Sequence, residues 1–470
     1  MTTDMTPLGS IDMKPRSRVL AVILILALIP ALIPALILTA AVPARAIEVQ
    51  RVISPGGIEA WLVEDHSNPI ITLDLVFRGG AALDPAGKEG LANLVSALID
   101  EGAGELDSQA FQGRLAELSI SLSFSAGRDT FSGEMMTLTE NREVAFELLR
   151  LALTEARFDE EPVTRIGSQI LAGLARDSQN PRSIVGRTMS KVLFPEHAYG
   201  RPVSGTTATV PAITAAEMRR FVAERFARDV MVIGVVGDIA AEELARRLDQ
   251  TFLGLPAAAA PMEVAETTPV AQGGVVVIER DMPQSIVAFG HAGIARDDPD
   301  YYAAYVVNYI LGGGGFTSRL YAEVREKRGL AYSIYSYLNP LQSAALVMGG
   351  VATQNERVAE SLELIRAEWR RMAEAGPSET ELRNAKTYLT GSFPLRFTSS
   401  ARISGMLAGM QLHELGIDYL ERRNGLIEAV TLEDARRVAA RLYDADKLTV
   451  VVIGRPDGIT ATRPAPPLDG

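Results

Sequence analysis

Few side chains in this sequence could carry hydrolytic or metal chemistry. The chain has four histidines, His66, His197, His291 and His413, and no two lie close together in sequence. An isolated histidine is more often an ordinary hydrogen-bonded surface or core residue than a metal ligand. There is no cysteine, which excludes disulfides, thiolate nucleophiles and cysteine-based metal sites. No G-x-S-x-G motif offers a serine nucleophile. Two segments of chemical interest remain, one rich in glycine and one helical.

The glycine-rich segment contains Gly312, Gly313, Gly314 and Gly315, directly before a stretch of helical character. Free N–H groups at the start of a helix can hold an anion such as phosphate. However, no Gly-Lys-Ser/Thr follows to complete a P-loop, and no G-x-G-x-x-G frame fits. We therefore interpret the four glycines as a tight, close-packed turn into the next helix.

The helical segment is residues 89–101. Its apolar residues recur at helical spacing and form one stripe, made by Leu91, Leu94, Val95, Leu98 and Ile99. At about 100° per residue, Asn93, Ser96, Ala97 and Asp100 fall on the opposite face. We expect that face to point away from the core covered by the apolar stripe.

The elements around these segments indicate two domains of similar plan. Residues 256–274 are rich in alanine and proline without periodicity, which is typical of a linker. On each side, strand-like runs come first, helices follow and a strand returns last, which favours an α+β fold present twice. A long helical middle is expected in the first domain. The strand-like runs are residues 58–63, 70–78, 230–236, 275–279, 285–290 and 448–453, and a helix is expected from Tyr301. The predicted domains are residues 47–255 and 275–466.

Composition indicates a folded protein, and the N-terminal segment indicates that it is exported. Hydrophobic residues make up 47% of the chain and charged residues 22%, as in globular domains. The net charge is −12 with no basic patch, so no nucleic-acid partner is expected. Residues 1–46 have a positive start, an apolar run and an A-x-A site, which predict a signal peptide and a periplasmic location. The alternative is an uncleaved membrane anchor, because the apolar run approaches the roughly 20 residues that cross a bilayer.

The helix at residues 89–101 resembles the inverted zinc motif, H-x-x-E-H, of pitrilysin/insulinase-type metallopeptidases. In that motif two histidines bind zinc, and the glutamate deprotonates a metal-bound water. Asn93, Ser96 and Ala97 stand at those three positions. An amide is a poor zinc ligand, a methyl group is none, and a hydroxyl cannot serve as a carboxylate base. The family's third ligand is a glutamate on a later helix, whose counterpart here, residues 165–175, has no carboxylate. The resemblance therefore implies no metal or other cofactor in this chain.

The resemblance extends over nearly all of residues 47–460 and is most specific in residues 312–332. The C-terminal domain of this family has a glycine-rich segment, then an arginine and a tyrosine seven residues apart that reach substrate lying on the zinc. Arg325 and Tyr332 match that spacing. A guanidinium donates in a fixed fork and a neutral phenol donates one hydrogen bond, so both suit a peptide carbonyl or the oxyanion formed from it. The alternative is that Arg325 is one more charge on a solvated helix and Tyr332 only begins a strand.

The resemblance implies a fold of two homologous domains, each a mostly antiparallel sheet flanked by helices, joined by a linker as half of a clamshell. In two-component members, one subunit brings zinc and the other brings the arginine–tyrosine pair. We therefore expect a non-catalytic, substrate-binding subunit that forms a heterodimer with a zinc-bearing homologue and supplies Arg325 and Tyr332 in trans to unfolded peptides. The alternatives are a catalytically inert peptide-binding or scaffold protein and, less favoured, an independent hydrolase.

Overall fold

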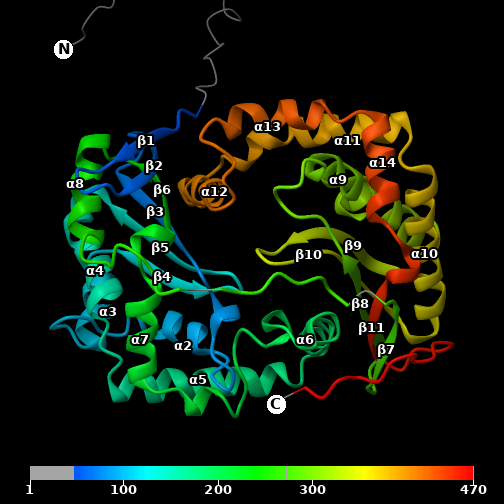
Figure 1. The fold of residues 1–470 in the computed structure, drawn as a ribbon, viewed down its shortest axis with the longest axis horizontal. Coiled ribbons are helices and arrows are strands. Elements are labelled where there is room, and N and C mark those ends of the chain that lie inside the picture. Colours follow the sequence, from blue (N-terminus) through cyan, green and yellow to red (C-terminus); the bar gives the residue numbers. More distant parts are fainter. Residues whose placement is uncertain (1–46, 262, 271, 469–470) are drawn as a thin grey trace, which may run out of the picture. The chain divides into compact units, whose positions relative to one another are not determined.

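Two mixed β-sheets flanked by helices make up the fold, which confirms the predicted α+β class (Figure 1). The computed structural model describes residues 47–261, 263–270 and 272–468, so the predicted signal peptide lies outside the described residues. The described residues from Val49 onward pack as one unit. Within this part of the chain, no helix is long and apolar enough to cross a membrane.

The first half of the unit contains a six-stranded sheet in the order β1-β2-β6-β3-β5-β4. The pair β2–β6 is parallel, and the other pairs are antiparallel. Its strands are β1 (Gln50–Ile53), β2 (Glu59–Glu64), β3 (Ile70–Arg78), β4 (Ser121–Ala126), β5 (Thr130–Leu138) and β6 (Met231–Gly237). Its helices are α2 (Leu91–Leu98), α3 (Ser108–Glu117), α4 (Arg142–Glu155), α5 (Glu160–Asp177), α6 (Pro181–Leu193), α7 (Ala215–Arg225) and α8 (Ala241–Phe252).

The second half contains a five-stranded sheet in the order β7-β11-β8-β10-β9, in which only β7–β11 is parallel. Its strands are β7 (Gly274–Glu279), β8 (Gln284–Ala292), β9 (Ala331–Pro340), β10 (Ala345–Gln354) and β11 (Thr449–Gly454). Its helices are α9 (Tyr301–Asn308), α10 (Val358–Ala375), α11 (Glu379–Gly391), α12 (Ser400–Leu412), α13 (Tyr419–Glu428) and α14 (Leu432–Leu442).

The two sheets share one topology. The order β2-β6-β3-β5-β4 of the first corresponds strand by strand to β7-β11-β8-β10-β9 of the second. This agrees with the predicted internal duplication. The expected long helical middle of the first half is wrong for residues 121–138, which form the hairpin β4–β5.

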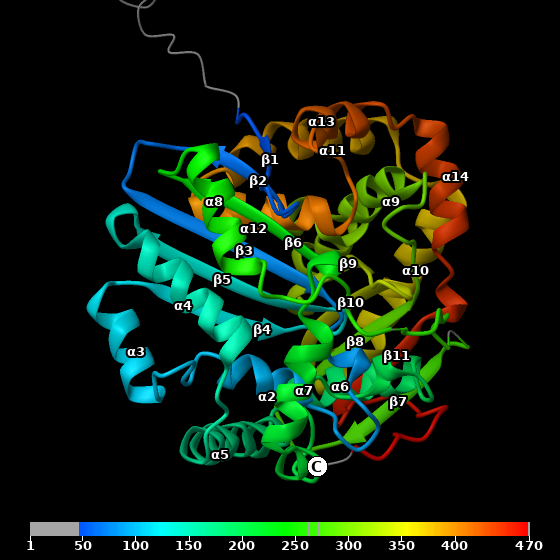
Figure 2. The same ribbon diagram turned by 60° about the vertical axis from the view of Figure 1, so that its left-hand side comes forward.

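Each half contributes one helix to the other half's sheet. Helix α12, from the second half, packs against β3 and β6 of the first sheet, and α6, from the first half, packs against β8 and β11 of the second (Figures 1 and 2). We call α6 and α12 the exchanged helices. Because each covers a sheet face of the opposite half, the two halves share buried surface rather than meeting only through a linker.

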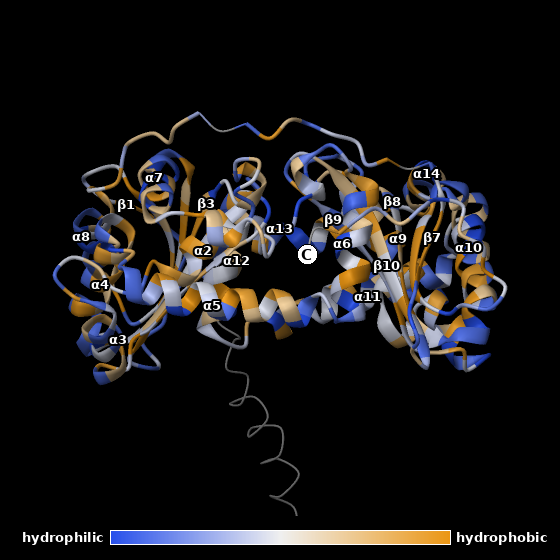
Figure 3. Ribbon diagram, turned by 90° about the horizontal axis from the view of Figure 1, so that it is seen from below, coloured by the Kyte–Doolittle hydropathy of each residue, from blue (hydrophilic) through white to orange (hydrophobic). Residues whose placement is uncertain are grey.

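Aromatic side chains fill both cores. In the first, Phe77 stacks on Phe226 with ring centres 4.6 Å apart, and in the second Phe289 meets Trp369 edge to face at 5.5 Å. Coloured by hydropathy, the strands are largely hydrophobic, whereas outer helices such as α3 and α10 carry many hydrophilic residues (Figure 3). Burial of this apolar surface is the main force that holds the sheets between their helices.

Candidate functional site

Helix α2 carries the three positions of the degenerate zinc motif. Asp84 starts the helix, since its carboxylate accepts hydrogen bonds from the N–H groups of Gly90 at 3.0 Å and Ala92 at 3.1 Å. Burial raises the pKa of Asp84 to about 7 despite these bonds. Asn93 and Ala97 are half-buried, but Ser96 is buried. Ser96 is therefore covered by neighbouring structure, although its spacing places it on the helix face opposite the apolar stripe.

The side chains on α2 do not fit a zinc ion. Ser96 donates its hydroxyl to the backbone oxygen of Asn93 at 2.8 Å, so it serves its own helix. Helix α5, which packs beside α2, has its nearest carboxylates at its two ends, Glu160 and Glu161 at the start and Asp177 at the end. Among the described residues there is no group of three or more histidine, aspartate or glutamate side chains that could hold a metal.

Three of the four histidines have structural partners instead. His291 is buried and accepts a hydrogen bond from the indole of Trp369 at 2.9 Å, and burial lowers its pKa. His197 accepts from the N–H of Tyr199, and His66 lies 2.6 Å from Asp238. These contacts account for the three histidines without a metal.

Arg325 lies in a cluster of aromatic rings in the second half. It belongs to a π-helical segment, Tyr321–Glu326. Its guanidinium carbon is 4.7 Å from the ring centre of Tyr321, 5.5 Å from Tyr332 and 5.8 Å from Phe316. We call these four residues the Arg325 cluster. The neighbouring Lys327 and Arg328 both pair with Glu323, whereas Arg325 forms no ion pair with any described residue.

A β-bulge places Tyr332 on the exposed face of the second sheet. On β9, Ala331 pairs with Thr353 and Ile334 with Val351, so two residues of β9 oppose one of β10. The two residues are Tyr332 and Ser333, and both are exposed, with Tyr332 at 86%. Bulges commonly re-aim a side chain in this way. The bulge therefore brings the phenol of Tyr332 beside the guanidinium of Arg325.

The glycine-rich segment is a close-packed turn, as predicted, and the structure shows that it packs against β9. The chain passes through a π-helical turn, Tyr309–Gly313, and a 3₁₀ turn, Gly315–Thr317. A Cβ at Gly312 would lie 2.4 Å from the hydroxyl of Ser336, so only glycine fits there. Ser336 also donates to the side chain of Asn308 at 2.9 Å. The glycines thus let the backbone approach the strand that carries Tyr332.

A buried ion pair fixes the other end of this segment. Arg319, only 8% exposed, binds Glu381 through two hydrogen bonds of 2.6 and 2.8 Å and donates to the backbone oxygen of Gly376 at 2.9 Å. Glu381 also closes a capping box with Ser378 at the start of α11. Arg319 stands two residues before the π-helical segment, so this pair holds the backbone from which Arg325 projects.

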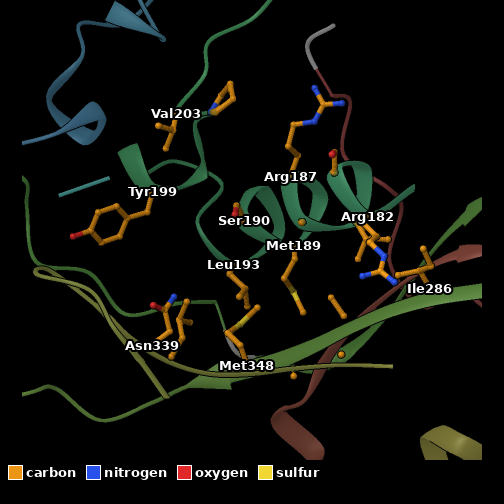
Figure 4. Close-up of a pocket in the computed structure, with 18 of the residues that line it drawn as sticks. Arg182, Arg187, Met189, Ser190, Leu193, Tyr199, Val203, Ile286, Asn339 and Met348 are labelled. Carbon is orange, nitrogen blue, oxygen red and sulfur yellow. The ribbon is translucent and has the colours of Figure 1, made fainter. Parts of the chain in front are cut away.

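The face of β9 that carries Tyr332 continues along the strand with exposed aromatic rings. Tyr335 and Tyr337 stack at 6.2 Å with an interplanar angle of 25°. They line a cavity of about 550 Å³ between the second sheet and the exchanged helix α6. In Figure 4, Met189 and Leu193 of α6 point toward Met348 of the sheet, and Tyr199 lies at one end. A surface of this kind can accept the side chains of an extended peptide.

The chain belongs to the M16 peptidase family, of which it is an inactive-type member. The family model described as the Peptidase M16 inactive domain matches residues 212–389. A Streptomyces coelicolor protein named an uncharacterized zinc protease is 30% identical over 340 residues, which are 68% of this chain and 73% of that protein. A Helicobacter pylori protein named a non-peptidase homolog is 28% identical over 343 residues, 73% of this chain and 79% of that protein.

Comparison with solved structures supports the same family and fold. The crystal structure of a peptidase M16 inactive domain from Pseudomonas fluorescens aligns with a TM-score of 0.82 and 30% identity, and covers 89% of this chain and 100% of that one. A Helicobacter pylori protease aligns with a TM-score of 0.78, but at 17% identity it supports the fold alone. The predicted resemblance to pitrilysin/insulinase-type peptidases is therefore confirmed at the level of family and fold.

The structure brings some predicted site residues together and separates others. Arg325, Tyr332 and the glycine-rich segment lie together in the second half, whereas the degenerate motif lies on α2 in the first. Sequence reasoning missed the aromatic neighbours Phe316 and Tyr321, and also the tyrosines that follow on β9. The pattern Tyr332, Tyr335, Tyr337 was visible in the sequence, but only the bulge puts all three on one face.

Proposed function

We propose that this chain is the non-catalytic, substrate-binding subunit of a two-subunit zinc peptidase. It would pair with a zinc-bearing homologue and supply Arg325 and Tyr332 to a peptide bound between them. The observation that carries the proposal is the asymmetry of the two sites. The motif on α2 has no metal-binding side chain, while the half-buried Arg325 lies beside the exposed ring of Tyr332.

The chemistry of the pair suits peptide binding. Arg325 has no ion pair among the described residues, so its N–H groups are available to a carbonyl oxygen of a bound peptide. Tyr332 can donate one hydrogen bond from its exposed hydroxyl. Such donors stabilise negative charge that develops on a peptide oxygen during hydrolysis. In this proposal the zinc and its activated water come from the partner subunit, and this chain only binds and orients the peptide.

The test is a cleavage assay on the chain co-purified with a zinc-bearing homologue from the same genome. Arg325→Ala and Tyr332→Phe should each lower peptide cleavage about tenfold or more, as expected from the loss of one hydrogen bond to a charged group. Arg328→Ala is the matched control, because Arg328 lies nearby but is paired with Glu323. Unchanged cleavage in both variants would show that the chain does not act in trans.

A catalytically inert peptide-binding or scaffold protein is the second candidate. It is favoured by the exposed rings on this half, since Phe316 is 71% exposed and Tyr388 58%, and exposed aromatic side chains often mark binding surfaces. Size-exclusion chromatography separates the two functions. A homodimer that ignores the zinc-bearing homologue favours the scaffold. In either case we propose a periplasmic location, which a fractionation experiment with an epitope-tagged chain can check.

A further inference from the structure

The second sheet exposes aromatic rings at an edge where the first sheet exposes hydroxyl groups. Strands β4 and β9 are edge strands that hold equivalent places in the two duplicated sheets. The exposed residues of β4 are Ser121, Ser123 and Ser125, whereas β9 exposes Tyr335 and Tyr337 after the bulge. The shared fold alone therefore does not account for the rings of β9, and exposed apolar surface of this kind commonly marks a binding site.

The strand register shows that these serines and tyrosines lie on the same side of their sheets. Residues directly opposite each other on paired strands share a face. Ser123 lies in one cross-strand row with Asp74, whose carboxylate is bonded to the exchanged helix α12. Tyr335 lies in one row with Ala288, which packs against the apolar cluster that contains α6. Each edge strand therefore presents its exposed residues on the face covered by an exchanged helix.

The wall beside the tyrosines is the apolar side of the exchanged helix α6. Val185, Met189 and Leu193 are buried and line the cavity of Figure 4. Met189 and Leu193 point toward Met348 of β10, whereas Arg187 points away from the sheet (Figure 4). Helix α6 packs mainly on β8 and β11. The cavity therefore lies between an apolar helix side and the aromatic edge of the sheet.

Two nearly parallel rings form the floor of this cavity at its open end. Tyr335 lies against Gly350 of β10, where an added Cβ would be 2.9 Å from the tyrosine hydroxyl and 3.1 Å from the adjacent ring carbon. Tyr337 is inclined to it by 25° and pairs across the strands with Met348. Ring faces and a polarisable thioether are favourable neighbours for an aromatic side chain. The cavity of about 550 Å³ lies within the size range of binding pockets.

We propose that this cavity is a subsite for an aromatic side chain of the bound peptide, such as that of phenylalanine. The ring packs on Tyr335 and Tyr337 and buries its edge against Met189 and Met348. Removal of apolar surface from water drives the binding. The inference rests on the proposed function only for the peptide itself. The preference for an aromatic residue follows from the rings of β9 and the apolar side of α6.

The subsite continues the strand face on which Tyr332 is exposed. Ser333, the second residue of the bulge, lines the same cavity. Tyr335 and Tyr337 follow Tyr332 by three and five residues in the sequence. A strand and an extended peptide both rise about 3.3 Å per residue, so the aromatic residue lies about three to five residues from the residue that contacts Tyr332.

Binding of unlabelled peptides to the isolated full-length chain tests the inference without any partner subunit. The probes are three peptides of one uncharged sequence that differ at one central position, which is phenylalanine, leucine or serine. Isothermal titration calorimetry should show the phenylalanine peptide binding about tenfold more tightly than the serine peptide, with the leucine peptide between them.

Two double variants test the role of the rings. Tyr335→Ser combined with Tyr337→Ser copies the serines of β4, and it should remove the preference for phenylalanine and leave the serine peptide unchanged. Tyr335→Phe combined with Tyr337→Phe should keep the preference, because both rings remain. The comparison of peptides on the native chain needs no variant, so it decides the question even if the serine variant is unstable.

Leu253→Ser is the matched control, because Leu253 is an exposed apolar side chain directly after α8 and does not line the cavity. It should leave the preference intact, and an equal loss in this variant would overturn the inference. Equal affinity for the phenylalanine and serine peptides, or no binding of any peptide, would also overturn it. Equal affinity for the leucine and phenylalanine peptides would overturn the preference for an aromatic ring.

The inference and the proposed function fail separately. Selective binding of the phenylalanine peptide that depends on Tyr335 and Tyr337 supports the subsite even if Arg325→Ala does not change cleavage by the complex. Conversely, cleavage that depends on Arg325 but shows no preference for aromatic residues supports the proposed function and removes the subsite.

Discussion

At the scale of single residues, Asp74 shows how burial changes the chemistry of a carboxyl group. It lies on β3, is 8% exposed and accepts a hydrogen bond from Ser404 on the exchanged helix α12. Burial raises its pKa to about 6, above the value near 3.9 expected in the unfolded chain. A group whose pKa is raised on folding contributes stability below its unfolded pKa, and this stability is lost as the pH rises through the folded pKa.

Asp74→Asn should therefore flatten the dependence of stability on pH. Between about pH 4.5 and about pH 7.5 the native chain should lose about 2 kcal/mol more of its free energy of unfolding than the variant, because the asparagine does not ionise. Urea unfolding at the two pH values measures this difference. Asp297→Asn, at an exposed aspartate, is the control and should parallel the native chain. Parallel curves for Asp74→Asn would contradict the assignment.

The positions and burial of individual side chains could be predicted from the sequence only in part. The spacing of Arg325 and Tyr332 was sufficient to expect them together, because the family frame fixes the turn between them. The burial of Ser96 could not be predicted, since helical periodicity describes one helix face and not what covers the other. The rings around Arg325 depend on a π-helical segment, and such segments have no simple sequence signal.

At the scale of elements, the Arg319–Glu381 pair should determine the stability of the segment that carries Arg325. Glu381→Ala leaves Arg319 buried without its carboxylate, so the free energy of unfolding should fall by about 3 kcal/mol. The ion pair and the capping box hold the pKa of Glu381 at about 2. Its contribution is therefore fully present above the unfolded pKa and is lost as the pH falls from that value through the folded pKa of about 2. Thermal unfolding at neutral pH measures the change.

Glu379→Ala is the control for this variant, because Glu379 stands in the same first turn of α11 and is exposed. It should change the unfolding temperature little. An equal effect of the two substitutions would mean that the loss comes from the helix start and not from the buried pair.

The turn of glycines gives a second prediction at this scale. A methyl group at Gly312 would meet Ser336 of β9, so Gly312→Ala should lower the free energy of unfolding by about 1–3 kcal/mol through overpacking. It should also displace Tyr332, which hydrogen exchange of β9 can detect. Gly391→Ala is the matched control, because nothing lies within 4 Å of a Cβ at Gly391. If both substitutions have the same effect, the close approach at Gly312 is not what requires glycine.

Some elements were predictable and others were not, for a physical reason. The central strands β3, β6 and β11 are buried apolar runs, and their sequence shows it directly. Strand β4 reads Ser-Leu-Ser-Phe-Ser-Ala and is a half-exposed edge strand. It alternates polar and apolar residues and so lacks the continuous apolar run that marks the central strands. Strand β9 is also an edge strand, with tyrosines on its open face. Edge strands are defined by their partners, which a single sequence does not show.

At the scale of the whole described unit, both helix packing and hydrogen bonds join the halves. The exchanged helices cover the opposite sheets. In addition, the buried Tyr199 donates to Asp129 at 2.6 Å and accepts from the N–H of Ser343 at 2.9 Å, while Gln342 donates to Asp129 at 3.0 Å. These last bonds join the turn of β4–β5 to the turn of β9–β10. The halves are thus held together by burial and hydrogen bonding, with the linker as an additional covalent connection.

The linker should therefore be dispensable once the chain has folded. A protease site inserted between Ala257 and Ala258, which are exposed, can be cut in the purified protein. The two fragments should then co-elute in size-exclusion chromatography and unfold in a single thermal transition, because each exchanged helix would expose its apolar face if the halves separated. Residues 47–255 expressed alone should aggregate or bind a hydrophobic dye, since α6 would lack the sheet formed by β8 and β11. Fragments that separate after cleavage, or a well-folded isolated half, would show that the exchanged helices do not hold the unit together.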